Sequence, residues 1–141
     1  MPGAVRVIAL LALSSLLFSC GLGESDPSPA DPTGRRYVST EVGGRPIPGG
    51  GPLVLSFPAR ERLAATAGCN RLTGTVDLSG GTIRAGALAS TPMSCPPRLD
   101  GADDWMRTLF DGRPRWTLDG DVLTLTTGAA TVTLTERADR R

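Results

Sequence analysis

Short alternating runs of apolar and polar residues occupy the middle of the chain. Two of them, over residues 53–57 and 62–68, place an apolar side chain at every second position: Leu53, Leu55, Phe57, Leu63, Ala65 and Ala67. A period of two puts such residues on one face of a β-strand. Residues 72–78 and 82–85 continue this pattern on either side of Ser79-Gly80-Gly81, which suits a hairpin turn.

The pattern is clearest near the end of the chain. Residues 115–126 alternate around Asp119-Gly120, a dipeptide that favours a tight two-residue turn, and a further run over residues 131–135 follows Gly128. One face of these last strands is apolar: Leu123, Leu125, Val132 and Leu134. Because threonines fill the opposite positions, we expect an antiparallel sheet with one face in the core and one in solvent.

One segment, residues 99–110, has helical spacing instead. Its apolar stripe consists of Leu99, Ala102, Met106 and Leu109. Asp100, Asp103 and Asp104 would complement the dipole in its first turn, and Gly112 and Pro114 would end it. The predicted fold class is therefore α+β: a mostly antiparallel, barrel-like or strongly curved sheet with one amphipathic helix packed on it.

The N-terminal segment has the features of a secretory signal. A single Arg6 precedes an apolar run too short to span a bilayer, and Leu17-Phe-Ser-Cys20 resembles a bacterial lipobox. We expect residues 1–19 to be a lipoprotein signal peptide and Cys20 to be lipidated, since two acyl chains give a stable anchor. Phe18 departs from the usual lipobox. The alternative is ordinary cleavage near Ser19, which would leave Cys20 as a free thiol.

The segment after Cys20 is rich in Pro, Ser and Asp and has no apolar periodicity. It cannot bury enough surface to offset its chain entropy, so residues 20–35 are predicted to be a disordered tether. One folded domain over residues 36–137 and a disordered end at 138–141 complete the predicted organisation. The expected location is the extracytoplasmic side of a cell membrane.

Composition limits the chemistry available to this domain. Lys+Arg and Asp+Glu number 15 and 14, for a net charge of +1, so nothing favours a nucleic-acid partner. All the cations are arginines, as codon usage in a GC-rich genome would give. The chain has no His, which removes Ser-His-Asp and Cys-His mechanisms. We expect a monomer with no metal, no cofactor and no catalytic residue.

Two motifs in the predicted domain resemble the META domain family. Gly68-Cys69-Asn70 is followed by Gly74, and Thr91-Pro-Met93-Ser-Cys95 lies further along, before the helix and the closing hairpin. The resemblance covers roughly residues 36–136. It implies a compact α+β domain of the bacterial envelope, associated in some members with stress and antibiotic tolerance and without an established catalytic activity. Tyr37 stands where family members usually begin with Trp.

The motif residues also have roles that follow from their chemistry. Gly68 suits the end of a strand, and Asn70 suits a side-chain-to-backbone turn. The alternative is that Asn70 and Arg71 contact a ligand. We expect Met93 and Trp105 to fill the core rather than form a recognition surface.

The even number of remaining cysteines, the expected oxidising compartment and the family resemblance together predict a disulfide between Cys69 and Cys95. If lipid occupies Cys20, an even pair of cysteines is left in an oxidising compartment. Three alternatives stay open. The thiols could be buried and reduced, could be reactive with only Arg71 nearby to activate them, or could bind a metal, for which two ligands without His are few.

The predicted function is that of a non-catalytic envelope lipoprotein that binds or protects another envelope component, in stress or antibiotic tolerance. A carrier of a small apolar molecule is the alternative and would need a hollow sheet. An enzyme is the third possibility, because Asp119 and Asp121 flank a turn and two acids open the helix; structural roles account for these positions.

Overall fold

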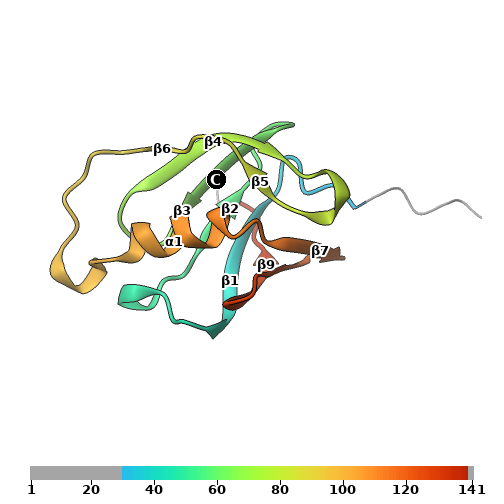
Figure 1. Ribbon diagram of the computed structural model, residues 1–141. Helices are drawn as coiled ribbons and strands as arrows, with labels where there is room; N and C mark the ends of the chain where they lie inside the picture. The colour runs from blue at the N-terminus through green and yellow to red at the C-terminus, as the bar shows by residue number, and fades with distance from the viewer. Residues whose placement is uncertain (1–29, 140–141) are drawn as a thin grey trace, which may run out of the picture.

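The computed structural model describes residues 30–139, in which nine strands and one α-helix form a strongly curved antiparallel sheet with the helix packed against it (Figure 1). The strands are β1 (Arg36–Gly44), β2 (Val54–Ser56), β3 (Arg62–Thr66), β4 (Arg71–Asp77), β5 (Arg84–Ala85), β6 (Ala89–Ser90), β7 (Arg115–Asp119), β8 (Val122–Thr126) and β9 (Ala130–Glu136). The helix is α1 (Ala102–Asp111). The predicted fold class is confirmed.

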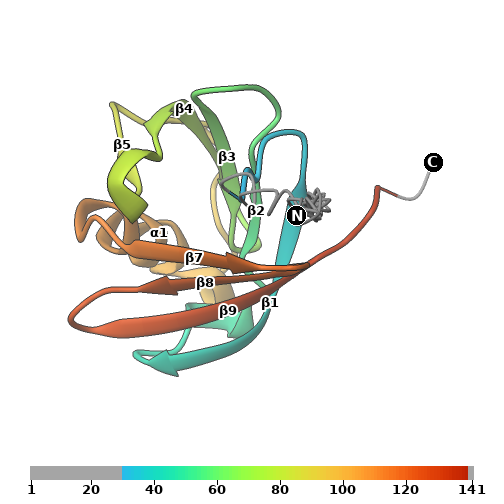
Figure 2. The ribbon, with the colours of Figure 1, turned by 90° about the vertical axis from the view of Figure 1, so that its right-hand side faces the viewer.

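The strand order is β5-β4-β3-β2-β1-β9-β8-β7, with β6 also paired to β4. The two outer strands nearly meet, because Thr82 forms a bridge with Arg115 and the Ile83 amide donates to the Pro114 carbonyl at 2.8 Å. Figure 2 shows β1, β9, β8 and β7 as one layer from which β3, β4 and β5 turn away. The sheet is therefore curled into a barrel-like shape, and α1 covers its open side.

Alternation along the strands determines the core. The apolar faces expected from the sequence are buried in β2, β3, β8 and β9, and Tyr37 of β1 joins them. The helix adds Ala102, Trp105, Met106, Leu109 and Phe110. These side chains fill the concave side of the sheet, so its interior is a packed core and not the hollow that a carrier of the predicted kind would need.

The hairpin between β7 and β8 differs from the prediction by one residue. Its two loop residues are Gly120, with φ of 59°, and Asp121, rather than Asp119 and Gly120. This register pairs Leu118 with Leu123, whereas a turn centred one residue earlier would place Leu118 opposite Asp121. A turn with glycine at its first central position satisfies the pairing.

The ends of two other predicted segments are corrected. The helix begins at Ala102, so Asp103 and Asp104 lie in its first turn while Asp100 precedes it, after the short 3-10 turn Pro97–Leu99.

The predicted tether extends too far along the chain. Pro32 is buried, and the Gly34 amide donates to the Phe57 carbonyl at 2.7 Å. Residues 32–35 therefore belong to the folded domain.

The predicted signal peptide and Cys20 lie outside the described residues, as does most of the predicted tether. Within residues 30–139, no helix is long and apolar enough to cross a membrane.

Candidate functional site

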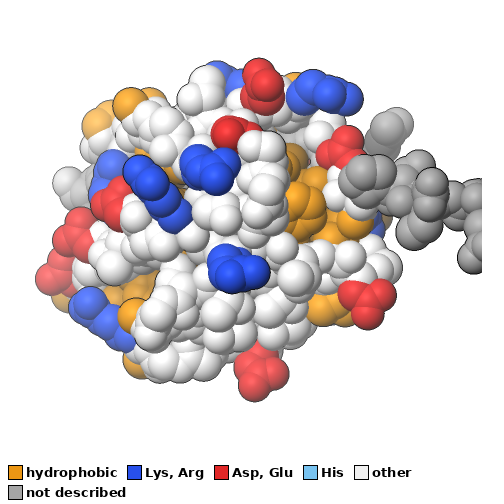
Figure 3. Space-filling model, turned by 45° about the vertical axis from the view of Figure 1, so that its right-hand side comes forward, with side chains coloured by type: hydrophobic (Ala, Val, Ile, Leu, Met, Phe, Trp, Pro, Cys, Tyr) orange, Lys and Arg blue, Asp and Glu red, His pale blue; other side chains and the backbone are white. Residues whose placement is uncertain are grey.

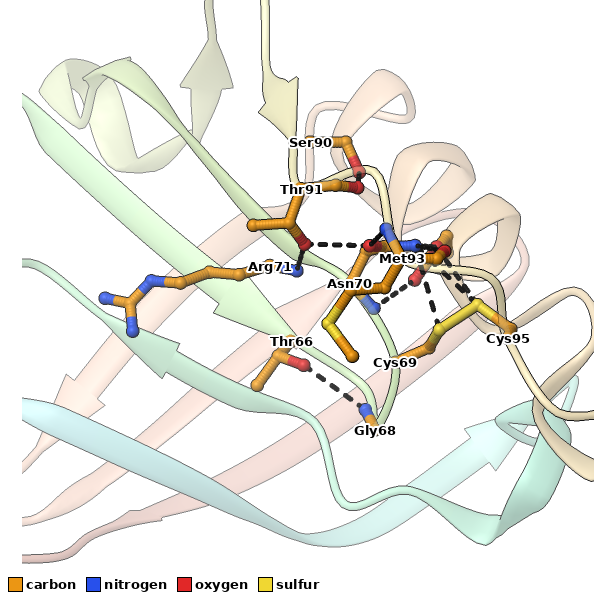
Figure 4. The surroundings of a disulfide bond; sticks show 10 residues. Thr66, Gly68, Cys69, Asn70, Arg71, Ser90, Thr91, Met93 and Cys95 are labelled. Carbon is orange, nitrogen blue, oxygen red and sulfur yellow. Dashed lines mark hydrogen bonds between the residues drawn. A yellow bond between two sulfur atoms is a disulfide. The ribbon is translucent and has the colours of Figure 1, made fainter.

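The two predicted motifs meet at one end of the sheet, where a disulfide joins Cys69 and Cys95 (Figure 4). Cys69 lies in the loop between β3 and β4. Cys95 lies in the segment over residues 86–98, which runs from the end of β5 to the turn before α1 and which we call the strap. The cysteine Cα atoms are 5.7 Å apart. The bond therefore ties the strap to the sheet next to the N-terminus of the helix.

Asn70 connects this loop to the strap. Its side-chain amide donates to the Met93 carbonyl at 3.0 Å, and its side-chain oxygen accepts from the Met93 amide and from the Thr91 hydroxyl, both at 2.8 Å. The residue is only 6% exposed. The predicted local turn at Asn70 is thus wrong, because its partners lie 21 and 23 positions away.

Asp103 completes the hydrogen bonding of Asn70. Its Oδ2 accepts from the Asn70 side-chain amide at 2.7 Å, and its Oδ1 accepts from the Asn70 backbone amide at 3.2 Å. With Met93 and Thr91, this satisfies both donors and both acceptor positions of the Asn70 side chain. Sequence reasoning assigned Asp103 to the helix dipole alone. A first-turn acid carries no local signal of a partner 33 positions earlier.

Met93 is the clearest departure from the predicted site. It was expected in the core, yet the residue is 63% exposed. The backbone explains this position, since both the amide and the carbonyl of Met93 bond Asn70 and so face the domain. The side chain is left outside, on the outer surface of the strap. Trp105, by contrast, is buried as predicted and donates from its indole to the Arg45 carbonyl at 3.0 Å.

The two motif glycines allow the chain to come close at the site. Gly68, two residues after the end of β3, has φ of 116°, and a side chain there would also press on Leu99. Gly74 lies at the base of the strap and not at the disulfide. A Cβ there would come within 2.9 Å of both the Ala87 carbonyl oxygen and the Leu88 side chain. Both positions therefore support the packing of the strap on the sheet.

Arg71 does not join Asn70 in a common ligand site. Its side chain extends away from Asn70 in Figure 4 and lines a separate depression of about 400 Å³ on the outer face of β1–β4, with Arg36 and Asp139. Only its backbone contributes to the motif site, where the Arg71 amide donates to the Thr91 hydroxyl at 3.0 Å. The alternative in which Asn70 and Arg71 contact one ligand is not supported by this arrangement.

The sulfur atoms and Asp103 form the one cluster of possible metal ligands in residues 30–139, all within 4.8 Å of one another. The Cys95 Sγ lies 3.7 Å from the Asp103 Oδ2. Metal binding and nucleophilic chemistry both require a thiolate, which neither sulfur supplies while the disulfide is intact. In this state the cluster therefore serves as a structural junction between loop, strap and helix.

A second polar cluster lies at the start of β1. Arg35 Nε donates to Glu136 Oε2 at 2.7 Å, a bond that lowers the pKa of the Glu136 carboxyl, and the guanidinium lies 5.5 Å from the centre of the Tyr37 ring. Burial raises the pKa of Tyr37 to about 12. This cluster joins β1 to the last strand and contains no group poised for acid–base chemistry at neutral pH.

Comparison with known proteins places this arrangement in a family. A family model described as META domain matches residues 30–139. The chain belongs to the META domain family. The META domain here therefore contains both motifs, the strap and the helix, and begins before Arg36, as the buried Pro32 indicates.

Similar proteins agree with this assignment. The chain is 30% identical over 131 residues to heat shock protein HslJ of Escherichia coli (strain K12), covering 91% of this chain and 93% of HslJ. A protein structure solved by NMR is 29% identical, with a TM-score of 0.60 over 75% of this chain and 94% of that one. A second, from Burkholderia xenovorans, is 18% identical with a TM-score of 0.58, covers 99% and 100% of the two chains, and supports the fold alone.

Proposed function

We propose that this META domain is the binding module of an envelope lipoprotein, which contacts another envelope component and performs no catalysis. The lipobox-like Leu17-Phe-Ser-Cys20 supports export and lipid anchoring, and a disulfide suits an oxidising compartment. The name of HslJ, a heat shock protein, supports a role under stress.

The observation that carries the proposal is the exposed Met93 on a strap that is fixed at several points. Strand β6 pairs the strap with β4, Asn70 holds both backbone groups of Met93, and the disulfide fixes Cys95. Exposed prolines at positions 92, 96 and 97 flank it. A side chain presented on a fixed backbone loses little entropy on binding, and methionine adapts to varied apolar partners.

The same contacts support a role without catalysis. The polar groups of Asn70 are used internally, and the cysteines are joined to each other. Oppositely charged side chains are interspersed over the face seen in Figure 3, and hydrophobic side chains show there in separate small patches. The face in that view therefore offers no single strongly charged area to a partner.

The test places a photo-crosslinking amino acid at position 93 of the full chain in its own cells, before and after heat stress. Position 121, on the turn between β7 and β8, is the control site, because Asp121 is exposed and lies outside the strap. We expect one envelope component to crosslink from position 93 and not from position 121. Met93→Asp should abolish its co-purification while leaving the melting temperature unchanged. Equal crosslinking from both sites, or none from position 93, would contradict the proposal.

The proposed lipid anchoring at Cys20 has its own test. Cys20→Ala should release the protein from membranes or leave it unprocessed, because no acyl chain can then be attached. Cell fractionation and the mass of the mature protein measure this. If Cys20→Ala is cleaved and fractionates like the wild type, the chain is not a lipoprotein, whatever the strap binds.

A further inference from the structure

A second surface feature lies away from the strap, between α1 and the turn that joins β8 to β9. It is an open pocket of about 320 Å³. Trp105 and Leu109 line it from the helix, and Ala129 and Ala130 line it from the turn. The pocket has the size and the mainly apolar lining of small-molecule sites, which begin at about 300 Å³.

The walls of this pocket are held in place by hydrogen bonds. The Trp105 indole donates to the Arg45 carbonyl at 3.0 Å, which fixes the ring on one side. On the other side, the Thr127 hydroxyl accepts from the amides of Ala129 and Ala130 at 3.2 and 3.1 Å. The pocket is therefore formed before any ligand arrives, which lowers the ordering cost of binding.

Charge distinguishes the pocket from a plain apolar depression. Arg45 is the one charged residue among those that line it, and within residues 30–139 it takes part in no ion pair. A cation at the edge of apolar walls complements a molecule with an apolar body and an anionic head. At about 30 Å³ for each water-sized group, the volume holds roughly ten non-hydrogen atoms.

We propose that this pocket binds a small amphipathic carboxylate, with the carboxylate at Arg45 and the apolar body against Trp105 and Leu109. The pocket borders the core, since Trp105 and Leu109 are also core residues, and none of the residues that line it belongs to the strap. The inference does not depend on the proposed function, since an envelope partner at Met93 and a small ligand here would occupy different surfaces.

The experiment titrates octanoate and octylamine, which share a chain and differ in charge, into the full chain lacking only its lipid. Binding is followed by calorimetry and by NMR shifts of the Trp105 indole and the Ala129 and Ala130 amides. We expect octanoate to bind at millimolar or lower concentration with shifts confined to these groups, and octylamine to bind much more weakly.

Two variants test the assignment within the pocket. Arg45→Gln should weaken octanoate binding about fivefold to tenfold, because the Trp105 bond is to the Arg45 backbone and survives the change. Arg107→Gln, on the same helix but outside the pocket, is the matched control. Gly128 also lines the pocket, and a Cβ there meets no atom within 4 Å, so Gly128→Leu adds a side chain at the pocket without a clash and should weaken octanoate binding.

Three outcomes would overturn the inference. They are equal binding of the two probes, equal effects of Arg45→Gln and Arg107→Gln, or the absence of octanoate binding at millimolar concentration. Failure at the strap would leave these results unchanged, so the two proposals are distinguishable.

Discussion

At the scale of single residues, Asn70 has the largest number of partners in the motif region. It bonds Thr91, Met93 and Asp103, which come from the strap and the helix. Since the side chain is buried, losing it would leave several polar groups without partners. Asn70 is therefore best described as the residue that holds three separate segments in one arrangement.

We predict that Asn70→Ala lowers the free energy of unfolding by about 2–4 kcal/mol, because the buried polar groups that bond Asn70 would lose their hydrogen-bond partners. Asn70→Asp keeps the shape but places a carboxylate against Asp103, so at neutral pH it should cost at least as much. Denaturant unfolding measures both. A loss below about 0.5 kcal/mol for either variant, the usual range for exposed surface changes, would contradict the structural role.

Tyr37, unlike Asn70, has a buried polar group without a hydrogen-bond partner among the described residues. Its ring is fully buried against Phe57, but its hydroxyl has no hydrogen-bond partner within residues 30–139. Tyr37→Phe removes an unpaired polar group and keeps the ring, so it should leave stability unchanged or raise it by about 1 kcal/mol. Thermal unfolding checks this. A clear loss of stability would mean that the hydroxyl is satisfied in solution.

At the scale of elements, α1 joins the core to the motif site. Met106 is fully buried against the sheet, while the two first-turn acids differ, with Asp104 exposed and Asp103 bonded to Asn70. One face of the helix thus supplies apolar burial, and its N-terminus supplies a specific polar contact.

Three helix variants separate these contributions. Met106→Asp should cost about 3–5 kcal/mol, since it buries an unpaired charge, whereas Asp104→Ala should cost about 1 kcal/mol or less. Asp103→Ala should lie between them, because it shares the dipole effect and also loses the bonds to Asn70. Melting temperatures give the order. Equal values for Asp103→Ala and Asp104→Ala would show that the contact with Asn70 adds nothing.

At the scale of the whole molecule, long-range links close the sheet. Strand β1 pairs with β9, the ion pair between Arg35 and Glu136 joins the start of the domain to its last strand, and the disulfide joins loop and strap. Each link connects segments far apart in the chain. The disulfide responds to reductant and the ion pair responds to pH.

Reduction of the disulfide should lower stability without necessarily unfolding the domain. The cysteines are 26 positions apart, for which loop-closure entropy gives roughly 3.5 kcal/mol at 25 °C. A small domain is typically stable by about 5–15 kcal/mol, so the melting temperature should fall markedly. Thermal unfolding with and without reductant measures the change, and a Cys69→Ser/Cys95→Ser variant should not respond. Two alkylated thiols in exported, unreduced protein would rule the bridge out.

The ion pair between Arg35 and Glu136 predicts a pH dependence. Because Arg35 lowers the folded-state pKa of Glu136, this contribution is present above the unfolded-state pKa, near about 4.3, and is lost as the pH falls through the lower folded value. Glu136→Gln should therefore lose less stability than the wild type between about pH 5 and pH 3. Parallel stability curves for the two proteins would show that the pair contributes nothing.

Local chemistry in the sequence determined the elements and the cysteine pair. The period of two in residues 53–57 and 131–135, and the helical stripe through Met106, depend only on which side chains are apolar, and all of these faces are buried in the structure. The pairing of Cys69 with Cys95 was predicted from the even number of remaining cysteines, the expected compartment and the family resemblance together.

Tertiary structure alone decided the strand order, the register of the hairpin at Gly120, the partners of Asn70 and the exposure of Met93. Each depends on contacts between segments distant in sequence, and local pattern does not encode such contacts. Met93 was predicted from its residue type to fill the core. Its backbone bonds to Asn70 turned the side chain outward, because unpaired buried amides and carbonyls cost more than the exposure of one apolar side chain.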